Sequence, residues 1–128
     1  MASEFDTAHV KNIVLLGHAG SGKTSLAECM LFEAGLINRK GSVPERNTVS
    51  DYHPLEQERA NSIFSTLLHT RWRGYKINIL DTPGYTDFVG EVLAALRVAD
   101  TGVMLLNAAE GVEVGTDVIW GDTEQFKT

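Results

Sequence analysis

Short, nearly continuous apolar runs alternate along the chain with segments whose apolar residues recur at helical spacing. Residues 11–16 and 102–107 are such runs, and a strand buried on both faces of a sheet has this pattern. Residues 22–35, 86–100 and 112–126 instead place apolar side chains three and four positions apart, which predicts three helices. The last of these helical patterns is the weakest.

Residues 62–72 and 75–80 predict two further strands, joined by the short connection Arg73-Gly74. So short a connection implies an antiparallel hairpin. Residues 36–62 show no periodicity and predict a long loop, of the kind that is functional or disordered. The order strand, helix, loop, two strands, helix, strand, helix predicts an α/β fold with a mostly parallel sheet, one antiparallel hairpin strand and helices on both faces.

The composition is that of an ordinary soluble domain, with 128 residues of which 43% are hydrophobic and 22% charged. The formal net charge of −6 argues against direct DNA binding, and the basic cluster of Arg71, Arg73 and Lys76 favours a solvent-exposed hairpin tip. No apolar run reaches the roughly 18 residues of a membrane-spanning helix. The N-terminus has no apolar core typical of a secretory signal, so we expect no membrane partner and a cytoplasmic protein.

The stretch GHAGSGKT, residues 17–24, matches the phosphate-loop motif G-x-x-x-x-G-K-[ST] at every fixed position. It lies between a predicted strand and a predicted helix, where backbone N–H groups and the helix dipole favour phosphate. Lys23 supplies positive charge for the β- and γ-phosphates, and the Thr24 hydroxyl can bind Mg²⁺. The residues expected to hold the nucleotide here are Gly17, His18, Ala19, Gly20, Ser21, Gly22, Lys23, Thr24 and Ser25.

A second candidate segment, DTPG, begins at Asp81, the end of the second hairpin strand, and closes with Gly84. Ligands of such sheets bind at the carboxyl ends of the strands. An Asp there can hold Mg²⁺ through water, and a Gly amide can approach a γ-phosphate because no Cβ intervenes. A switch of this kind needs one more hydroxyl from the long loop, and Ser62 is better placed than Thr48 or Ser50, which occur earlier.

Four stretches resemble the GTP-binding domain of translational GTPases, with the closest likeness to elongation factor G and its elongation-factor-G-like paralogues: GHAGSGKTSL, DYHPLEQERANSIFS, INILDTPGYTDF and LRVADTGVMLLNAAEGVEVGT. The resemblance runs from about Val10 to Trp120 in order and spacing. It implies a phosphate-loop GTPase fold, GTP and Mg²⁺ as ligands, and a factor that hydrolyses GTP on the ribosome. It also implies that Ser62 replaces the Mg²⁺-ligating Thr of the first switch, and that Asp81 to Gly84 begin the second.

Three departures from the family pattern cluster around the expected γ-phosphate. Tyr85 stands where elongation factor G has the His that orders the attacking water, Gly20 replaces an Asp, and Ala19 and Asn61 replace a large aliphatic pair. A phenol cannot become cationic near neutral pH, but one hydrogen bond from it can still position a water. The resemblance thus implies Lys23 and Tyr85 as catalytic groups. The alternative is a GTP-sensing regulatory module with slow or no hydrolysis.

The N-K-x-D motif that reads guanine in this family does not occur in the sequence. We therefore expect residues 1–128 to be the N-terminal part of a GTP-binding domain, an incomplete domain whose last strands are absent and whose sheet has an exposed edge. Without that motif, an ATPase of another phosphate-loop class is a second alternative, although residues 51–63 and 100–115 argue against it.

Overall fold

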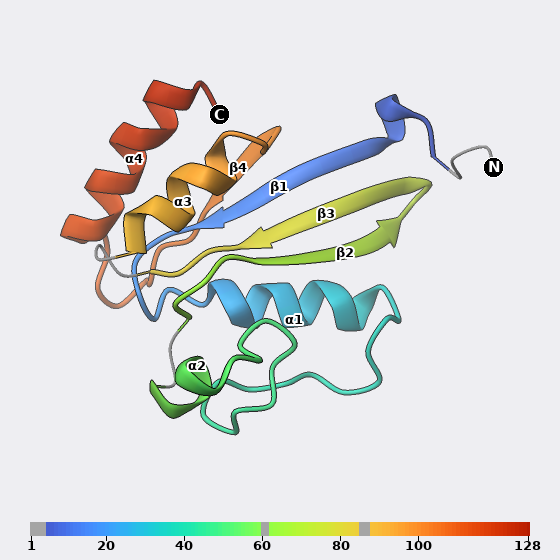
Figure 1. Cartoon of the computed structure of the whole chain (residues 1–128), viewed down its shortest axis with the longest axis horizontal. Helices are drawn as coiled ribbons and strands as arrows, with labels where there is room; N and C mark the ends of the chain where they lie inside the picture. The colour runs from blue at the N-terminus through green and yellow to red at the C-terminus, as the bar shows by residue number, and fades with distance from the viewer. Residues whose placement is uncertain (1–4, 60–61, 85–87) are drawn as a thin grey trace.

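The computed structural model describes residues 5–59, 62–84 and 88–128 (Figure 1). The strands are β1 (Val10–Leu16), β2 (Thr66–Trp72), β3 (Tyr75–Asp81) and β4 (Thr101–Met104). The helices are the short 3-10 turn η1 (Thr7–His9), α1 (Lys23–Glu33), α2 (Pro54–Arg59), α3 (Val89–Leu96) and α4 (Val114–Phe126).

The four strands form one sheet in the order β2-β3-β1-β4. β1 pairs in parallel with both β3 and β4, whereas β2 pairs antiparallel with β3 through the hairpin at Arg73-Gly74. Leu15 of β1 lies opposite Asp81 of β3, so the carboxyl ends of these two strands meet at one edge of the sheet. That register brings the phosphate-loop motif and the DTPG segment together, and the expected α/β fold class is confirmed.

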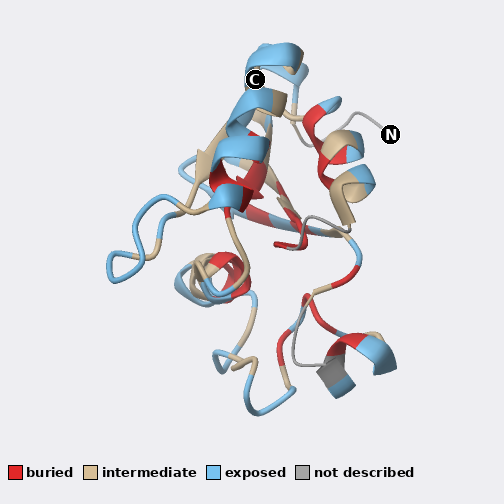
Figure 2. Ribbon diagram, turned by 90° about the vertical axis from the view of Figure 1, so that its left-hand side faces the viewer, coloured by how far each residue is buried: buried red, intermediate tan, exposed pale blue. Residues whose placement is uncertain are grey.

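Helices cover both faces of the sheet, with α1 on one side and α3 and α4 on the other (Figure 1). Val14 and Leu16 pack with Val92 and Ile119 on the α3 and α4 side, whereas Leu15 packs against α1 on the opposite side. Figure 2 shows the buried residues gathered in the sheet and on the inner sides of these helices. The continuous apolar run of β1 thus has the physical basis that the sequence indicates, burial on both faces. None of the described helices has the length and hydrophobicity that a bilayer crossing requires.

Several elements differ from the sequence prediction. The short helix α2 lies inside the long loop, and its six residues are too few to show a helical period. β2 begins at Thr66 rather than at residue 62, because the backbone N–H groups of Ile63, Phe64 and Ser65 donate to side-chain carboxylates instead of a neighbouring strand. β4 is also shorter than expected and ends at Met104.

Candidate nucleotide-binding site

The phosphate loop joins β1 to α1 through three glycines in backbone conformations that L side chains rarely adopt. Gly17, Gly20 and Gly22 have φ values of 139°, 80° and 94°. A Cβ on Gly17 would collide with the carbonyl oxygen of Leu105 in the segment after β4. The loop therefore packs tightly against the segment after β4. It leads into the first turn of α1, where unpaired N–H groups favour an anion.

The side chain of Lys23 is buried inside this loop. Its Nζ donates to the carbonyl oxygens of Gly17 and His18, both at 2.8 Å. Burial lowers the pKa of Lys23 to about 8, and the negative charge of Asp81 only partly opposes this shift. Neutral carbonyls hold this buried ammonium without neutralising its charge, so an anionic phosphate is the ligand that it favours.

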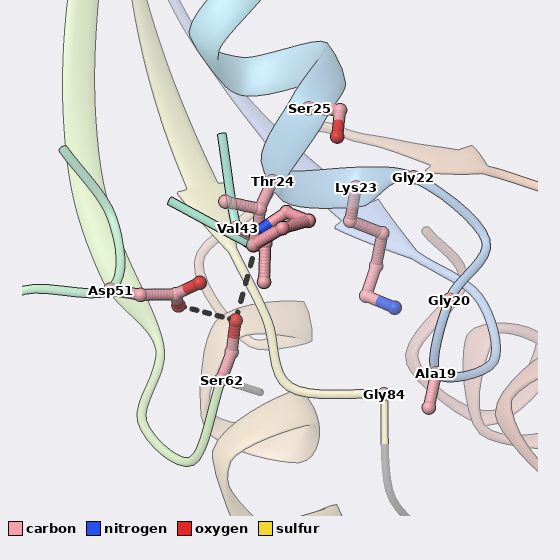
Figure 3. Close-up of a pocket in the computed structure, with 11 residues that line it drawn as sticks. Ala19, Gly20, Gly22, Lys23, Thr24, Ser25, Val43, Asp51, Ser62 and Gly84 are labelled. Carbon is pink, nitrogen blue, oxygen red and sulfur yellow. Dashed lines mark hydrogen bonds between the residues drawn. The ribbon is translucent and has the colours of Figure 1, made fainter. Parts of the chain in front are cut away.

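Beside the loop, α1, the long loop and β3 bring polar side chains together, and Figure 3 shows Thr24, Asp51 and Ser62 among them. The Thr24 hydroxyl donates to Oδ2 of Asp81 at 2.9 Å and lies 3.3 Å from the Ser62 hydroxyl. Ser62 in turn donates to Oδ1 of Asp51 at 2.6 Å. The structure thus brings together Thr24, Ser62 and Asp81, the three residues expected to manage a metal ion, and adds Asp51.

This cluster fits a divalent cation. Oδ2 of Asp51 and Oδ1 of Asp81 are buried and have no hydrogen-bond partner among the described residues. Two carboxylates and two hydroxyls form a set of hard oxygen donors, and Mg²⁺ prefers such donors. No group of three or more His, Cys, Asp and Glu side chains in the described ranges could hold a metal, so the hydroxyls of Thr24 and Ser62 are needed to complete the set.

Electrostatics at the cluster also favours a cation. Burial raises the pKa of Asp81 to about 6, although neighbouring hydroxyls and the Lys23 ammonium lower it in part. Burial likewise raises the pKa of Asp51, whose hydrogen bond from Ser62 opposes the shift. Two buried carboxyl groups that resist ionisation would be relieved by a positive ion between them.

A cavity of about 370 Å³ opens over the phosphate loop and this cluster. Gly84 of the DTPG segment lies at its edge, and a Cβ there would come within 2.5 Å of the backbone nitrogen of Ala19. The second segment therefore packs directly on the phosphate loop, which only a glycine allows. The cavity is lined by Ala19, Gly20, Gly22, Lys23, Thr24, Ser25, Val43, Pro44, Asp51, Ser62 and Gly84 (Figure 3).

The other predicted residues that the structure describes lie around this cavity rather than in its wall. Gly17 and Ser21 shape the loop, and the Ser21 N–H donates to the His18 carbonyl at 3.2 Å. The His18 ring turns to the start of α4, where its Nδ1 lies 2.9 Å from Oε2 of Glu113. Tyr85 lies outside the residues that the structure describes.

Three residues of the site do not appear among the sequence predictions. Asp51 belongs to the stretch DYHPLEQERANSIFS, and an acidic residue inside a family-like segment is the signal that could have found it. Val43 and Pro44 line the cavity from the non-periodic part of the loop. No local pattern in the sequence marks these two residues.

Comparison with known proteins identifies the relatives of this chain. The family model described as the elongation factor Tu GTP binding domain matches residues 8–128. Elongation factor G 2 of Borreliella afzelii is 36% identical over 118 residues, which are 92% of this chain and 18% of that protein. The mitochondrial ribosome-releasing factor 2 of Kluyveromyces lactis is 41% identical over 120 residues, which are 93% of this chain and 15% of that protein.

One solved structure is similar to this chain in both fold and sequence. A crystal structure of a protein from Thermus thermophilus has a TM-score of 0.89 and 39% sequence identity, over 92% of this chain and 18% of that one. The chain therefore spans less than a fifth of the length of each of these three proteins.

Proposed function

The chain belongs to the family of the elongation factor Tu GTP-binding domain, and we propose that it is the switch of an elongation-factor-G-like factor that hydrolyses GTP on the ribosome. The observation that carries this proposal is the meeting of Thr24, Ser62 and Asp81 beside the buried amine of Lys23. A phosphate loop, a hydroxyl from a long loop and an Asp at a strand end are the parts with which a GTPase senses its γ-phosphate.

In the proposed site each residue has a definite task. Lys23 neutralises phosphate charge, and the backbone N–H groups of residues 19–24 bind phosphate oxygens. Thr24 and Ser62 would hold Mg²⁺ through their hydroxyls, with Asp81 and Asp51 behind them. Bound there, Mg²⁺ supplies positive charge for the β- and γ-phosphates.

Gly84 and Tyr85 complete the proposal at the γ-phosphate end. The packing of Gly84 on Ala19 supports a role for the Gly84 amide as a sensor of that phosphate. Tyr85 directly follows Gly84 in the sequence, and we assign to its phenol the positioning of the attacking water. A single positioning group commonly contributes two to four orders of magnitude, roughly, to such a rate.

The test uses the intact protein. We expect tighter binding of GTP than of ATP, and single-turnover GTP hydrolysis that ribosomes accelerate. Tyr85→Phe should slow that turnover about 100-fold or more, because it removes the hydroxyl that holds the water. Tyr85→His serves as the matched variant, since it restores a hydrogen-bonding group. Equal turnover in Tyr85→Phe would remove the phenol from the mechanism.

The same assay separates the alternatives. A GTP-sensing module, which the phenol at position 85 favours, would bind GTP tightly and show no turnover that ribosomes accelerate. An ATPase is disfavoured, since the matching family is a GTP-binding domain, and preference for ATP would overturn the proposal. A cytoplasmic location stays a prediction, because one of the similar proteins is named as mitochondrial.

A further inference from the structure

Two glutamates outside the wall of the cavity are almost completely buried, and their negative charges help to raise the pKa of Asp51. Glu28 on α1 and Glu56 on α2 are each only 1% exposed. Burial of a carboxyl group costs free energy unless hydrogen bonds compensate for the lost water. In both residues the compensating donors are backbone N–H groups of the long loop between α1 and β2.

Glu28 ties one half of that loop to α1. Its Oε2 accepts the N–H of Gly41 at 2.8 Å, and its Oε1 accepts the N–H of Val49 at 2.5 Å. The chain near Gly41 and the chain near Asn47 pass each other closely here, because a Cβ on Gly41 would lie 2.5 Å from the carbonyl oxygen of Asn47. Figure 1 shows this part of the loop running back along α1, on the side away from the sheet. These contacts hold the two ends of residues 41–49 together. Val43 and Pro44 of this segment line the cavity.

Glu56 ties the other half of the loop together. Its Oε1 accepts the N–H groups of Ile63 and Phe64 at 2.9 and 3.0 Å, and its Oε2 accepts the N–H of His53 at 3.3 Å. These contacts join the chain just before α2 to the chain just after Ser62. One side chain therefore sets how closely the segments before and after α2 approach each other.

The anchored backbone positions lie next to the residues of the metal cluster. Asp51 follows Val49 by two residues, and Ser62 directly precedes Ile63. Figure 2 shows that buried stretches also occur in this loop, where Ser50 and Asp51 are buried. The position of the Asp51–Ser62 contact thus depends on both glutamates.

We propose that Glu28 and Glu56 are positioning residues. They hold the loop segments before and after α2 so that Asp51 and Ser62 meet at Thr24. They thereby set the part of the nucleotide affinity that depends on Mg²⁺. This last statement rests on the proposed function, whereas the anchoring of the loop does not.

The first test measures the loop without any nucleotide. Arg46 is exposed and lies between the two positions that Glu28 anchors. The rate at which trypsin cleaves after Arg46 therefore reports how firmly residues 41–49 are held. Glu28→Gln keeps the size of the side chain but places an amide N–H₂ against a backbone N–H. Cleavage after Arg46 in the intact protein should become about tenfold faster, because one buried hydrogen bond is lost. Glu33→Gln, an exposed glutamate on the same helix, should stay within about twofold of the wild type.

The second test measures dissociation of a fluorescent GTP analogue in Mg²⁺ and in EDTA. Glu28→Gln and Glu56→Gln should each speed dissociation about tenfold in Mg²⁺ and at most about twofold in EDTA. A role in folding alone would change both rates by the same factor. That outcome, or unchanged cleavage together with unchanged dissociation, would overturn the proposal.

The two tests also separate the two proposals. Faster cleavage after Arg46 in a protein that binds no GTP would refute the proposed function and leave the anchoring of the loop by Glu28 intact. The thermal unfolding of Glu56→Gln provides the check that a second variant is folded under the conditions of the assay.

Discussion

Asp81 shows how the candidate site couples ligand binding to stability. Its folded pKa of about 6 lies above the ordinary value of 3.8, so the folded state binds more protons than the unfolded state between these values. The contribution of Asp81 to stability is therefore fully present below about pH 4, and it is lost as the pH rises through about 6. A shift of this size corresponds to about 3 kcal/mol, which a bound cation would relieve.

This relation predicts the effect of Asp81→Asn on the nucleotide-free protein. The variant should be more stable than the wild type at pH 7, by up to about 3 kcal/mol, and nearly equal to it at pH 4. Urea unfolding at the two pH values measures the difference. A stability gain that is the same at both pH values would show that ionisation of Asp81 is not its source.

Ser62 allows a test of the hydroxyl itself. Ser62→Ala removes the donor to Asp51 and one oxygen of the cluster, so the Mg²⁺-dependent affinity for GTP should fall about 10- to 100-fold. Ser62→Thr keeps the hydroxyl and should remain within about threefold of the wild type. Titration of Mg²⁺ against a fluorescent GTP analogue distinguishes the two variants. Equal losses in both would indicate that packing, rather than the oxygen, matters at this position.

At the scale of elements, the DTPG segment after β3 packs closely on the phosphate loop after β1. The atom nearest to a Cβ on Gly84 belongs to the backbone of Ala19, which cannot rotate away as a side chain can. Gly90 in α3 provides a contrast, since a Cβ there would have no neighbour within 4 Å.

Alanine substitutions at these two glycines should therefore have different effects on GTP binding. Gly84→Ala should separate the two loops and weaken GTP binding more than about tenfold. Gly90→Ala should stabilise the protein by about 0.5–1 kcal/mol, because alanine favours the helix over the unfolded chain, and should leave binding unchanged. Isothermal titration with GTP and urea unfolding of both variants supply the measurements. Normal binding by Gly84→Ala would exclude the tight packing of these loops as a requirement.

At the scale of the whole molecule, ligand binding should appear as thermal stabilisation. GTP at about 100 times its dissociation constant adds about 2.7 kcal/mol to the folded state. For a domain of this size the melting temperature should rise by about 10 °C in Mg²⁺, and by much less when EDTA removes the ion. Differential scanning calorimetry with GTP, with and without Mg²⁺, measures the two shifts. Identical shifts in both conditions would contradict the assigned metal cluster.

The position of β4 in the sheet bears on the expected extent of the domain. β4 lies at the end of the strand order, and the chain spans less than a fifth of its relatives. The expectation that residues 1–128 are the first part of a longer GTP-binding domain stays a prediction.

The sequence by itself determined the order of the four strands and the three longer helices, and it determined the phosphate loop. Both are written locally: the burial of β1 on two faces requires a continuous apolar run, and the glycines of residues 17–24 stand at fixed spacing. The pairing of the DTPG segment with this loop also followed, since parallel strands place their carboxyl ends at one edge.

Only the tertiary structure decided how the long loop completes the site. Glu28 accepts hydrogen bonds from residues 13 and 21 positions away, and Ser62 bonds to Asp51 across 11 residues. Contacts over such distances in a segment without periodicity leave no repeating pattern of apolar and polar residues. The turn of His18 toward Glu113 is equally invisible in the sequence, because it depends on where α4 begins in space.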